Sequence, residues 1–182
     1  GLQVNDGRLV GIILNEEEEI PASQVLLAIG HSARDTFEML LHSGVSLKQK
    51  AFSIGARVEH PQMVINAAQY GKSAGMPELG PAEYKLVHNC QNGRSVYSFC
   101  MCPGGMVIGV GHEPETVVTN GMSYHARAGR NANSGLLVNV GPDDYGDAHP
   151  LAGIAFQRRW EQAAYVLGGG GFKAPVQRVG DL

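Results

Sequence analysis

The sequence has little charge and no excess of basic residues. It holds 14 Lys and Arg against 17 Asp and Glu in 182 residues, which gives a net charge of -3 and a charged fraction of 17%. Proteins that bind nucleic acid normally carry a basic surface, so no nucleic-acid partner is expected. No apolar run approaches the roughly 20 residues of a membrane-spanning helix, so no membrane partner is expected either.

Cysteine is scarce, with three residues and no C-x-x-C pair. This number supports neither a disulfide framework nor a zinc site, so we expect no metal and a reduced, cytoplasmic setting. Cys100 and Cys102 end a strand predicted over residues 94–102. Because alternate side chains of a strand share a face, both thiols are predicted on one face. Either cysteine is a candidate catalytic thiol beside a cofactor, and structural packing is the alternative.

A complete phosphate-binding motif, G-x-G-x-x-G, is absent, but part of such a site is present. Val25–Ile29 is a continuous apolar run, which predicts a strand buried on both faces. Gly30 follows it, and a helix is predicted from Asp35, with Glu38 as a capping-box partner. A strand, a glycine turn and a helix N-terminus together present free backbone N–H groups to an anion.

The turn at Gly30–Asp35 allows three interpretations. Its sequence half-matches the nucleophile elbow G-x-S-x-G of hydrolases, with Ser32 as nucleophile, although Arg34 replaces the second glycine. It also suits a phosphate or dinucleotide site, with Gly30 near the ligand and Arg34 supplying charge. The third interpretation is a plain connection between a strand and a helix.

The rest of the chain predicts an α+β fold, a mostly antiparallel sheet or open barrel with flanking helices. Turn signals and alternating apolar residues predict two hairpins and several single strands. The predicted strands are a hairpin over 2–14, a hairpin over 84–102, and strands over 52–59, 106–110, 116–119 and 135–140. Helices are predicted over 61–70 and 150–167, and the domain boundary divides residues 1–50 from residues 51–182.

A polar, glycine-rich tract between strands is the candidate substrate site. It begins at a predicted turn, Asn120-Gly121, and continues through Ser134. The candidate substrate-binding residues in it are Asn120, Ser123, Arg127 and Asn133. An ordered loop that satisfies its own backbone through Asn and Ser side chains has the same composition.

Several motifs in order along the chain resemble one family. They are V-L-L-A-I-G-H-S-A-R-D-T at 25–36, I-G-A-R-V-E-H-P-Q at 54–62, Y-S-F-C-M-C-P-G-G at 97–105, T-N-G-M-S at 119–123, N-A-N-S at 131–134 and A-P-V-Q-R-V-G-D at 174–181. With them the chain resembles the bacterial FAD-dependent dehydrogenases, also described as NAD/FAD-utilizing dehydrogenases, flavoproteins with an inserted substrate domain.

The resemblance implies that residues 1–50 are a remnant of an α/β FAD-binding domain and residues 51–182 the substrate or insert domain. The family's glycine-rich dinucleotide turn would precede Gly1, so the chain is expected to be a piece of a longer protein. FAD is then expected in the full-length protein and not in this piece, and NAD(P)H is a second candidate cofactor. The residues implied to border FAD are Gly30, His31, Ser32, Arg34 and Asp35.

The expected function is the substrate-side portion of a flavin-dependent oxidoreductase. Its expected partners are a small-molecule substrate and the remainder of its own FAD-binding domain. Two alternatives stay open, a non-catalytic binding or scaffolding domain and a serine hydrolase that uses Ser32.

Overall fold

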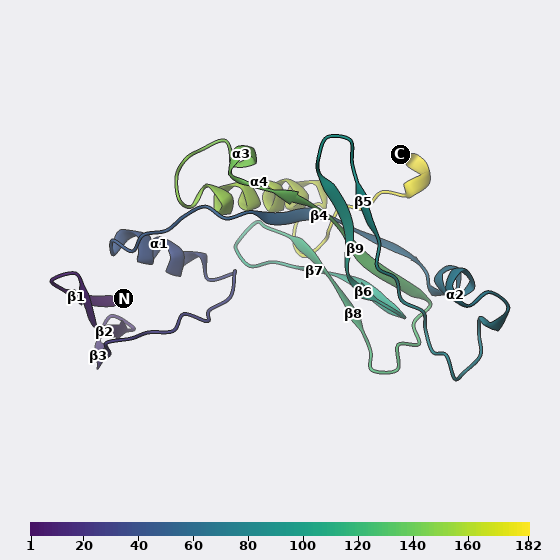
Figure 1. The fold of residues 1–182 in the computed structure, drawn as a ribbon, viewed down its shortest axis with the longest axis horizontal. Helices are drawn as coiled ribbons and strands as arrows, with labels where there is room; N and C mark the ends of the chain where they lie inside the picture. The colour runs from purple at the N-terminus through teal and green to yellow at the C-terminus, as the bar shows by residue number, and fades with distance from the viewer.

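A computed structural model describes all 182 residues and has an α+β fold (Figure 1). Every strand pairing is antiparallel, and the three sheets remain open. The predicted fold class is therefore confirmed. The strands are β1 Leu2–Asn5, β2 Arg8–Leu14, β3 Glu18–Pro21, β4 Phe52–Pro61, β5 Val87–Asn89, β6 Ser95–Cys102, β7 Gly105–Val110, β8 Val118–Ser123 and β9 Asn131–Val140. The helices are α1 Arg34–His42, α2 Gln62–Tyr70, α3 Pro142–Tyr145 and α4 Ala152–Leu167, with short 3-10 helices at Gly71–Ser73 and Val179–Asp181.

The first sheet, β1-β2-β3, lies at one end of the molecule, away from the central sheet (Figure 1). Its hairpin is confirmed, because Asp6 and Gly7 both adopt the left-handed conformation that a tight hairpin turn requires. The acidic run Glu16–Glu19 is a turn only in part, since Glu18 and Glu19 begin strand β3.

The predicted buried strand Val25–Ile29 is wrong for this chain. Residues 24–30 form no regular structure, and Leu26 is 93% exposed. No strand of the chain pairs with this run, so it lacks the neighbouring strands that a buried strand needs. The following helix α1 begins at Arg34 and ends before Gly44, which is left-handed, but no side-chain hydrogen bond caps its first residues, so the capping box predicted with Glu38 does not form.

The central sheet has the strand order β4-β9-β6-β5. Strands β4 and β9 pair along their whole length, from Phe52 opposite Val140 to Pro61 opposite Asn131. The alternating strand predicted from Phe52 and the hairpin predicted over residues 84–102 are both confirmed.

Strands β7 and β8 form a separate two-stranded ribbon beside the central sheet (Figure 1). The turn predicted at Asn120-Gly121 is wrong, because both residues lie inside β8, where Gly121 pairs with Val107. The polar tract is also not a continuous loop, since Asn131–Ser134 begins strand β9. Gly121 serves close packing and not a turn, since a Cβ there would overlap atoms of Asn133, Arg57 and Cys102.

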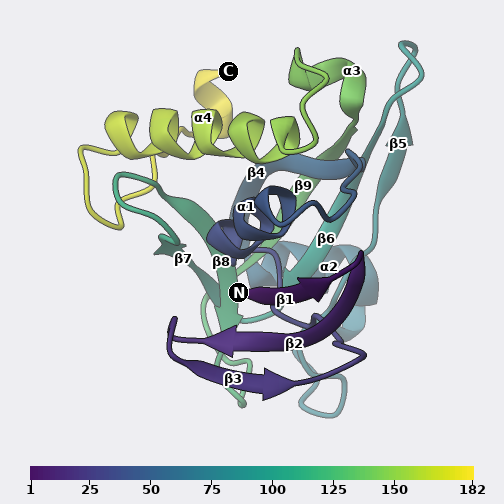
Figure 2. The ribbon, with the colours of Figure 1, turned by 90° about the vertical axis from the view of Figure 1, so that its left-hand side faces the viewer.

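Helix α4 lies along β4 in both views of the ribbon (Figure 2). Phe156 of α4 packs against Phe52 of β4, with ring centroids 6.2 Å apart, and against Tyr145 of α3 at 5.6 Å. The apolar side of α4 is only partly covered, since Trp160 is 47% exposed and Leu167 is 76% exposed. None of the helices is long and apolar enough to span a lipid bilayer.

Candidate functional site

Residues 30–35 contact the loop that joins β7 to β8. Ser32 Oγ lies 3.4 Å from His31 Nε2 and 3.3 Å from His112 Nδ1, and all three residues are exposed. The two imidazole rings meet edge to face, with centroids 5.5 Å apart. No carboxylate is hydrogen-bonded to either histidine, so the serine and histidine lack the third group that orients the base in a catalytic triad.

Arg34 lies in the interior, and its charge is compensated. Its side chain is 2% exposed and donates to Glu161 at 2.7 and 3.0 Å, to Gln157 at 3.0 Å, and to Glu113. Arg34 is predicted from the sequence to offer its positive charge to an anionic ligand. In this structure such a ligand would first have to displace the carboxylates of Glu113 and Glu161. Arg34 instead fastens α1 to α4 and to the β7–β8 loop.

Glu113 is the centre of this network, which we call the Arg34 cluster: Arg34, Glu38, Glu113, Gln157, Arg158 and Glu161. Arg158 donates to both oxygens of Glu113, at 2.6 to 3.1 Å. The Arg158 hydrogen bonds lower the pKa of Glu113 most, burial opposes them, and Arg34 adds to the lowering, so that the pKa falls from 4.5 to about 2.

A second group of polar residues lies where the β7–β8 ribbon meets the central sheet. Arg57 of β4 donates through Nη1 to Asn133 Oδ1 at 2.6 Å and to the carbonyl oxygen of Cys100 at 3.3 Å. A Cβ at Gly121 of β8 would overlap Asn133 Oδ1, Arg57 Nη1 and Cys102 Sγ. These three polar atoms therefore surround one point, and we call the set Arg57, Cys102, Gly121 and Asn133 the Arg57 cluster.

A β-bulge separates the two candidate cysteines. The pairing of β6 with β9 shifts between Phe99, opposite Gly135, and Cys102, opposite Asn133. Three residues along β6, from Phe99 to Cys102, therefore stand opposite only two residues along β9, from Gly135 to Asn133. The extra residue places the side chain of Cys102 on the same face of the sheet as that of Phe99. The prediction that both thiols lie on one face by simple alternation is therefore wrong, and the bulge directs Cys102 to the Arg57 cluster.

Three side chains donate hydrogen bonds to backbone carbonyls of the bulge and stabilise it. Cys100 has a φ of 45°, a conformation that costs a residue with a Cβ roughly 1–2 kcal/mol. Its carbonyl accepts from Arg57 Nη1 and, at 3.3 Å, from Cys102 Sγ, while Ser134 Oγ donates to the carbonyl of Phe99 at 3.1 Å. Such strain persists where the surroundings fix the backbone.

Arg57 has no carboxylate partner, unlike Arg34. Glu59, two residues along the same strand, accepts from Asn131 Nδ2 at 2.7 Å and from the Val107 N–H at 3.3 Å, and no ion pair joins it to Arg57. Asn133 is wholly buried, and its Nδ2 has no acceptor. The Arg57 cluster therefore holds a positive charge and a buried donor that the protein does not satisfy.

The other predicted substrate-binding residues lie at or outside the edge of the Arg57 cluster. Asn120 is exposed beside Gly121, and its Oδ1 accepts from the Gly121 N–H at 2.8 Å. Ser123 Oγ donates to the Pro103 carbonyl at 2.8 Å, and Arg127 pairs with Glu83 at 2.8 Å on the surface. The structure thus joins Cys102 with Asn133 and leaves Ser123 and Arg127 outside that contact.

Sequence reasoning missed Arg57 and Gly121. Arg57 carried only a weak signal, because it shares the polar face of the alternating strand with Ser53 and Glu59. Gly121 carried none, since the pair Asn-Gly is the strongest short turn signal and its role here depends on three strands far apart in sequence.

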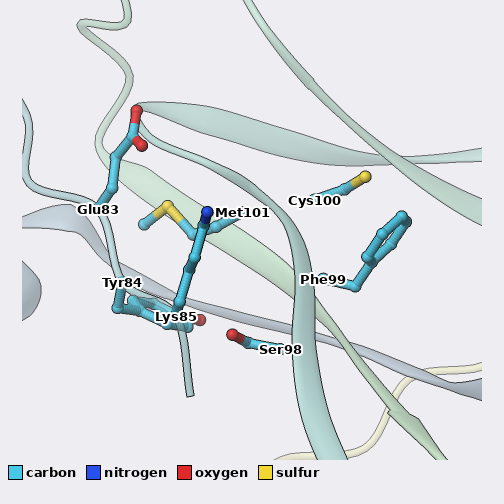
Figure 3. A pocket seen from close by; sticks show the side chains of 7 residues that line it. All are labelled: Glu83, Tyr84, Lys85, Ser98, Phe99, Cys100 and Met101. Carbon is cyan, nitrogen blue, oxygen red and sulfur yellow. The ribbon is translucent and has the colours of Figure 1, made fainter. Parts of the chain in front are cut away.

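A hollow of about 590 Å³ borders the bulge on the side of Cys100 (Figure 3). One wall is the segment before β5 and the other is the end of β6. The lining residues are Glu83, Tyr84, Lys85, Ser98, Phe99, Cys100 and Met101. Burial raises the pKa of Tyr84, whose hydroxyl lies 2.8 Å from His60 Nε2, and His60 Nδ1 is buried without a partner.

No three His, Cys, Asp or Glu side chains come together in a way that could hold a metal ion. Cys90, Cys100 and Cys102 are all free thiols. The chemistry of these sites thus rests on hydrogen-bond donors, one uncompensated guanidinium and thiols.

Residues 51–182 match the family described as "FAD-dependent protein, C-terminal domain-like". The chain belongs to this family. An uncharacterized protein of Clostridium beijerinckii is 51% identical over 178 residues, a match that covers 97% of this chain and 33% of that protein. The chain thus spans about a third of the length of this relative.

The turn at residues 30–35 has only part of what the pyrophosphate of FAD needs. A pyrophosphate needs free backbone N–H groups or cations. Two of the first three N–H groups of α1 are already used, because Arg34 N donates to Ser32 O at 2.9 Å and Thr36 N to Asp35 Oδ1 at 2.8 Å. Arg34 itself is compensated, so its side chain offers the turn no free positive charge.

Proposed function

We propose that this chain supplies the substrate side of an FAD-dependent dehydrogenase. The observation that carries the proposal is the uncompensated Arg57, held by Asn133 beside Cys102, in a chain of the FAD-dependent C-terminal family. A guanidinium without a counter-charge is suited to bind and orient an anionic reactant, which is what a protein must do when the cofactor carries the chemistry.

When bound, FAD would supply the hydride-transfer chemistry between the substrate and a second redox partner. The chain's own residues act on the substrate: Arg57 and Asn133 bind and orient it, and Asn120 lies at the rim. Cys102 at the cluster and Cys100 at the hollow are the two candidate thiols near the reacting atoms. NAD(P)H as a second reactant is part of this proposal.

FAD itself, on this proposal, is held mainly by polypeptide outside this chain. The exposed apolar run Val25–Ile29 supports it, because such a run is typical of a strand covered on both faces. We infer that this run pairs with the remainder of the FAD-binding domain in the intact, cytoplasmic protein. Gly30, His31 and Ser32, which are exposed, would then border the cofactor.

The colour of the purified intact protein tests this function. We expect flavin absorbance in the visible range, which NADH or NADPH bleaches under anaerobic conditions if a nicotinamide is the reductant. The 182-residue chain expressed alone is the control and should be colourless. A colourless intact protein that cannot be loaded with FAD contradicts the dehydrogenase and favours a non-catalytic binding or scaffolding domain.

A serine hydrolase is a second candidate because Ser32 Oγ lies 3.3 Å from His112 Nδ1. The missing carboxylate argues against it. Assaying the intact protein and its Ser32→Ala variant with p-nitrophenyl acetate separates the two functions. Equal rates for both proteins rule out Ser32 as a nucleophile, and loss of the rate in the variant supports the hydrolase.

A further inference from the structure

The Arg57 guanidinium is fixed in orientation with one edge unused. Its Nη1 donates to Asn133 Oδ1 and to the carbonyl of Cys100, from two different strands. Its Nε and Nη2 have no acceptor in the protein, and neither is among the buried atoms that lack a partner, so both are in contact with solvent. This free edge carries two parallel N–H donors, the geometry that matches the two oxygens of a carboxylate.

The surroundings supply donors but no balancing anion. Glu59 is the nearest acidic residue along the strand, and its two oxygens are held by Asn131 and by the Val107 backbone. Asn133 adds a wholly buried Nδ2 without an acceptor, and the Cys102 thiol also donates, to Cys100 O. The excess of donors together with one uncompensated positive charge favours a singly charged ligand that only accepts hydrogen bonds.

We propose that Arg57 binds the carboxylate group of a small-molecule substrate through Nε and Nη2, beside Cys102. This inference rests on the proposed function and names the chemical class of its substrate. A carboxylate suits the site better than a phosphate, because Arg57 is the one cation of the Arg57 cluster and balances a single negative charge. Orienting contacts from Asn133 and Cys100 O mean that little side-chain freedom is lost when the ligand binds.

Binding of acetate and benzoate to the intact protein, followed by ligand-observed NMR, tests the inference directly. We expect saturable binding of a carboxylate and none of benzamide, the neutral analogue of benzoate. Inorganic phosphate should compete poorly. Binding of phosphate with neither carboxylate bound, equal binding of benzamide and benzoate, or no binding of either carboxylate would overturn the proposal.

Three variants assign the binding to Arg57. Arg57→Gln removes the fork, and Asn133→Asp places a counter-charge against Nη1 while keeping Arg57 and the side-chain shape. Each should weaken benzoate binding by about tenfold or more, the loss of one charge-assisted contact. Arg159→Gln, at an exposed arginine over the Trp160 ring, is the matched control and should leave binding unchanged. Unchanged binding in a folded Asn133→Asp or Arg57→Gln variant contradicts the proposal.

The test also separates this inference from the proposed function. Flavin absorbance is measured on the same samples and does not depend on benzoate. Carboxylate binding that needs Arg57 in a protein without flavin keeps the site and removes the dehydrogenase. Flavin without carboxylate binding keeps the flavoprotein and removes the assigned substrate class.

Discussion

Arg34 and Arg57 are both at least partly buried, but they differ in the groups that surround their guanidinium charges. Arg34 is buried and meets two glutamates and a glutamine from α4 and the β7–β8 loop. Arg57 is half-buried and meets one amide oxygen and one backbone carbonyl. The charge of Arg34 is balanced by two carboxylates, although its Nε is buried without an acceptor, whereas Arg57 has no carboxylate partner.

The difference separates a structural arginine from a binding one. A guanidinium already balanced by two carboxylates gains little from an anionic ligand, whereas one with a free, solvent-accessible edge can form a charge-assisted pair with a carboxylate. Sequence position suggested the reverse assignment, with Arg34 at a cofactor turn and Arg57 within a strand. The partners of each side chain, and not its motif, decide its role.

Replacing Arg34 should produce the largest loss of stability. Arg34→Met leaves Glu113 and Glu161 partly buried without their shared cation, which costs about 3–5 kcal/mol for a broken buried ion pair. Arg57→Met should cost much less, because no carboxylate loses a partner. Urea denaturation of both variants measures the comparison, and equal losses would break the distinction between the two clusters.

Gly121→Ala should be the next largest effect and should act on the Arg57 cluster alone. The added Cβ would overlap atoms of Arg57, Asn133 and Cys102, and overpacking of this kind costs roughly 1–3 kcal/mol. Gly141→Ala is the matched control, since nothing lies within 4 Å of its Cβ position. Thermal unfolding should fall in the first variant and not in the second. A tolerated Gly121→Ala would mean that β8 does not pack closely on Arg57.

Acid should weaken the Arg34 cluster through Glu113. The pKa of Glu113 is lowered in the folded state, so its ionised form stabilises the fold at neutral pH. That contribution is lost as pH falls from about 4.5 to about 2. Glu113→Gln should remove this part of the pH dependence, seen as a flatter curve of unfolding free energy over that range. Glu17→Gln, in the exposed turn of the first sheet, should keep the wild-type curve.

The smallest effect is expected at Cys100. Cys100→Gly removes the cost of a left-handed residue but adds the backbone freedom of glycine to the unfolded chain, so a net gain under about 1 kcal/mol is expected. Urea midpoints compare it with Cys90→Gly, a cysteine outside the bulge. A clear loss in Cys100→Gly would show that the side chain itself stabilises the hollow.

Local patterns predicted most strands and helices because those elements follow from short-range signals. Alternation marked β4, Asn92-Gly93 marked the hairpin of β5 and β6, and Pro61 marked the start of α2. The strand predicted from the continuous apolar run Val25–Ile29 was wrong for a different reason. A strand covered on both faces needs neighbouring strands, and none in this chain lies beside it.

The candidate site was harder to predict because it depends on long-range contacts. Simple alternation placed Cys100 and Cys102 together, but donors from Arg57 and Ser134, on other strands, hold the bulge that separates them. Asn133 is predicted as a substrate-binding residue only because it is a polar residue in a polar tract. No local pattern could show that its amide meets Arg57 or that Gly121 closes over both.

The carbonyl of Cys100 faces the guanidinium, while its side chain borders the hollow beside Lys85. One residue therefore contacts both the Arg57 cluster and the hollow. A substitution that shifts the backbone of Cys100 would move an acceptor of Arg57 and one wall of the hollow together.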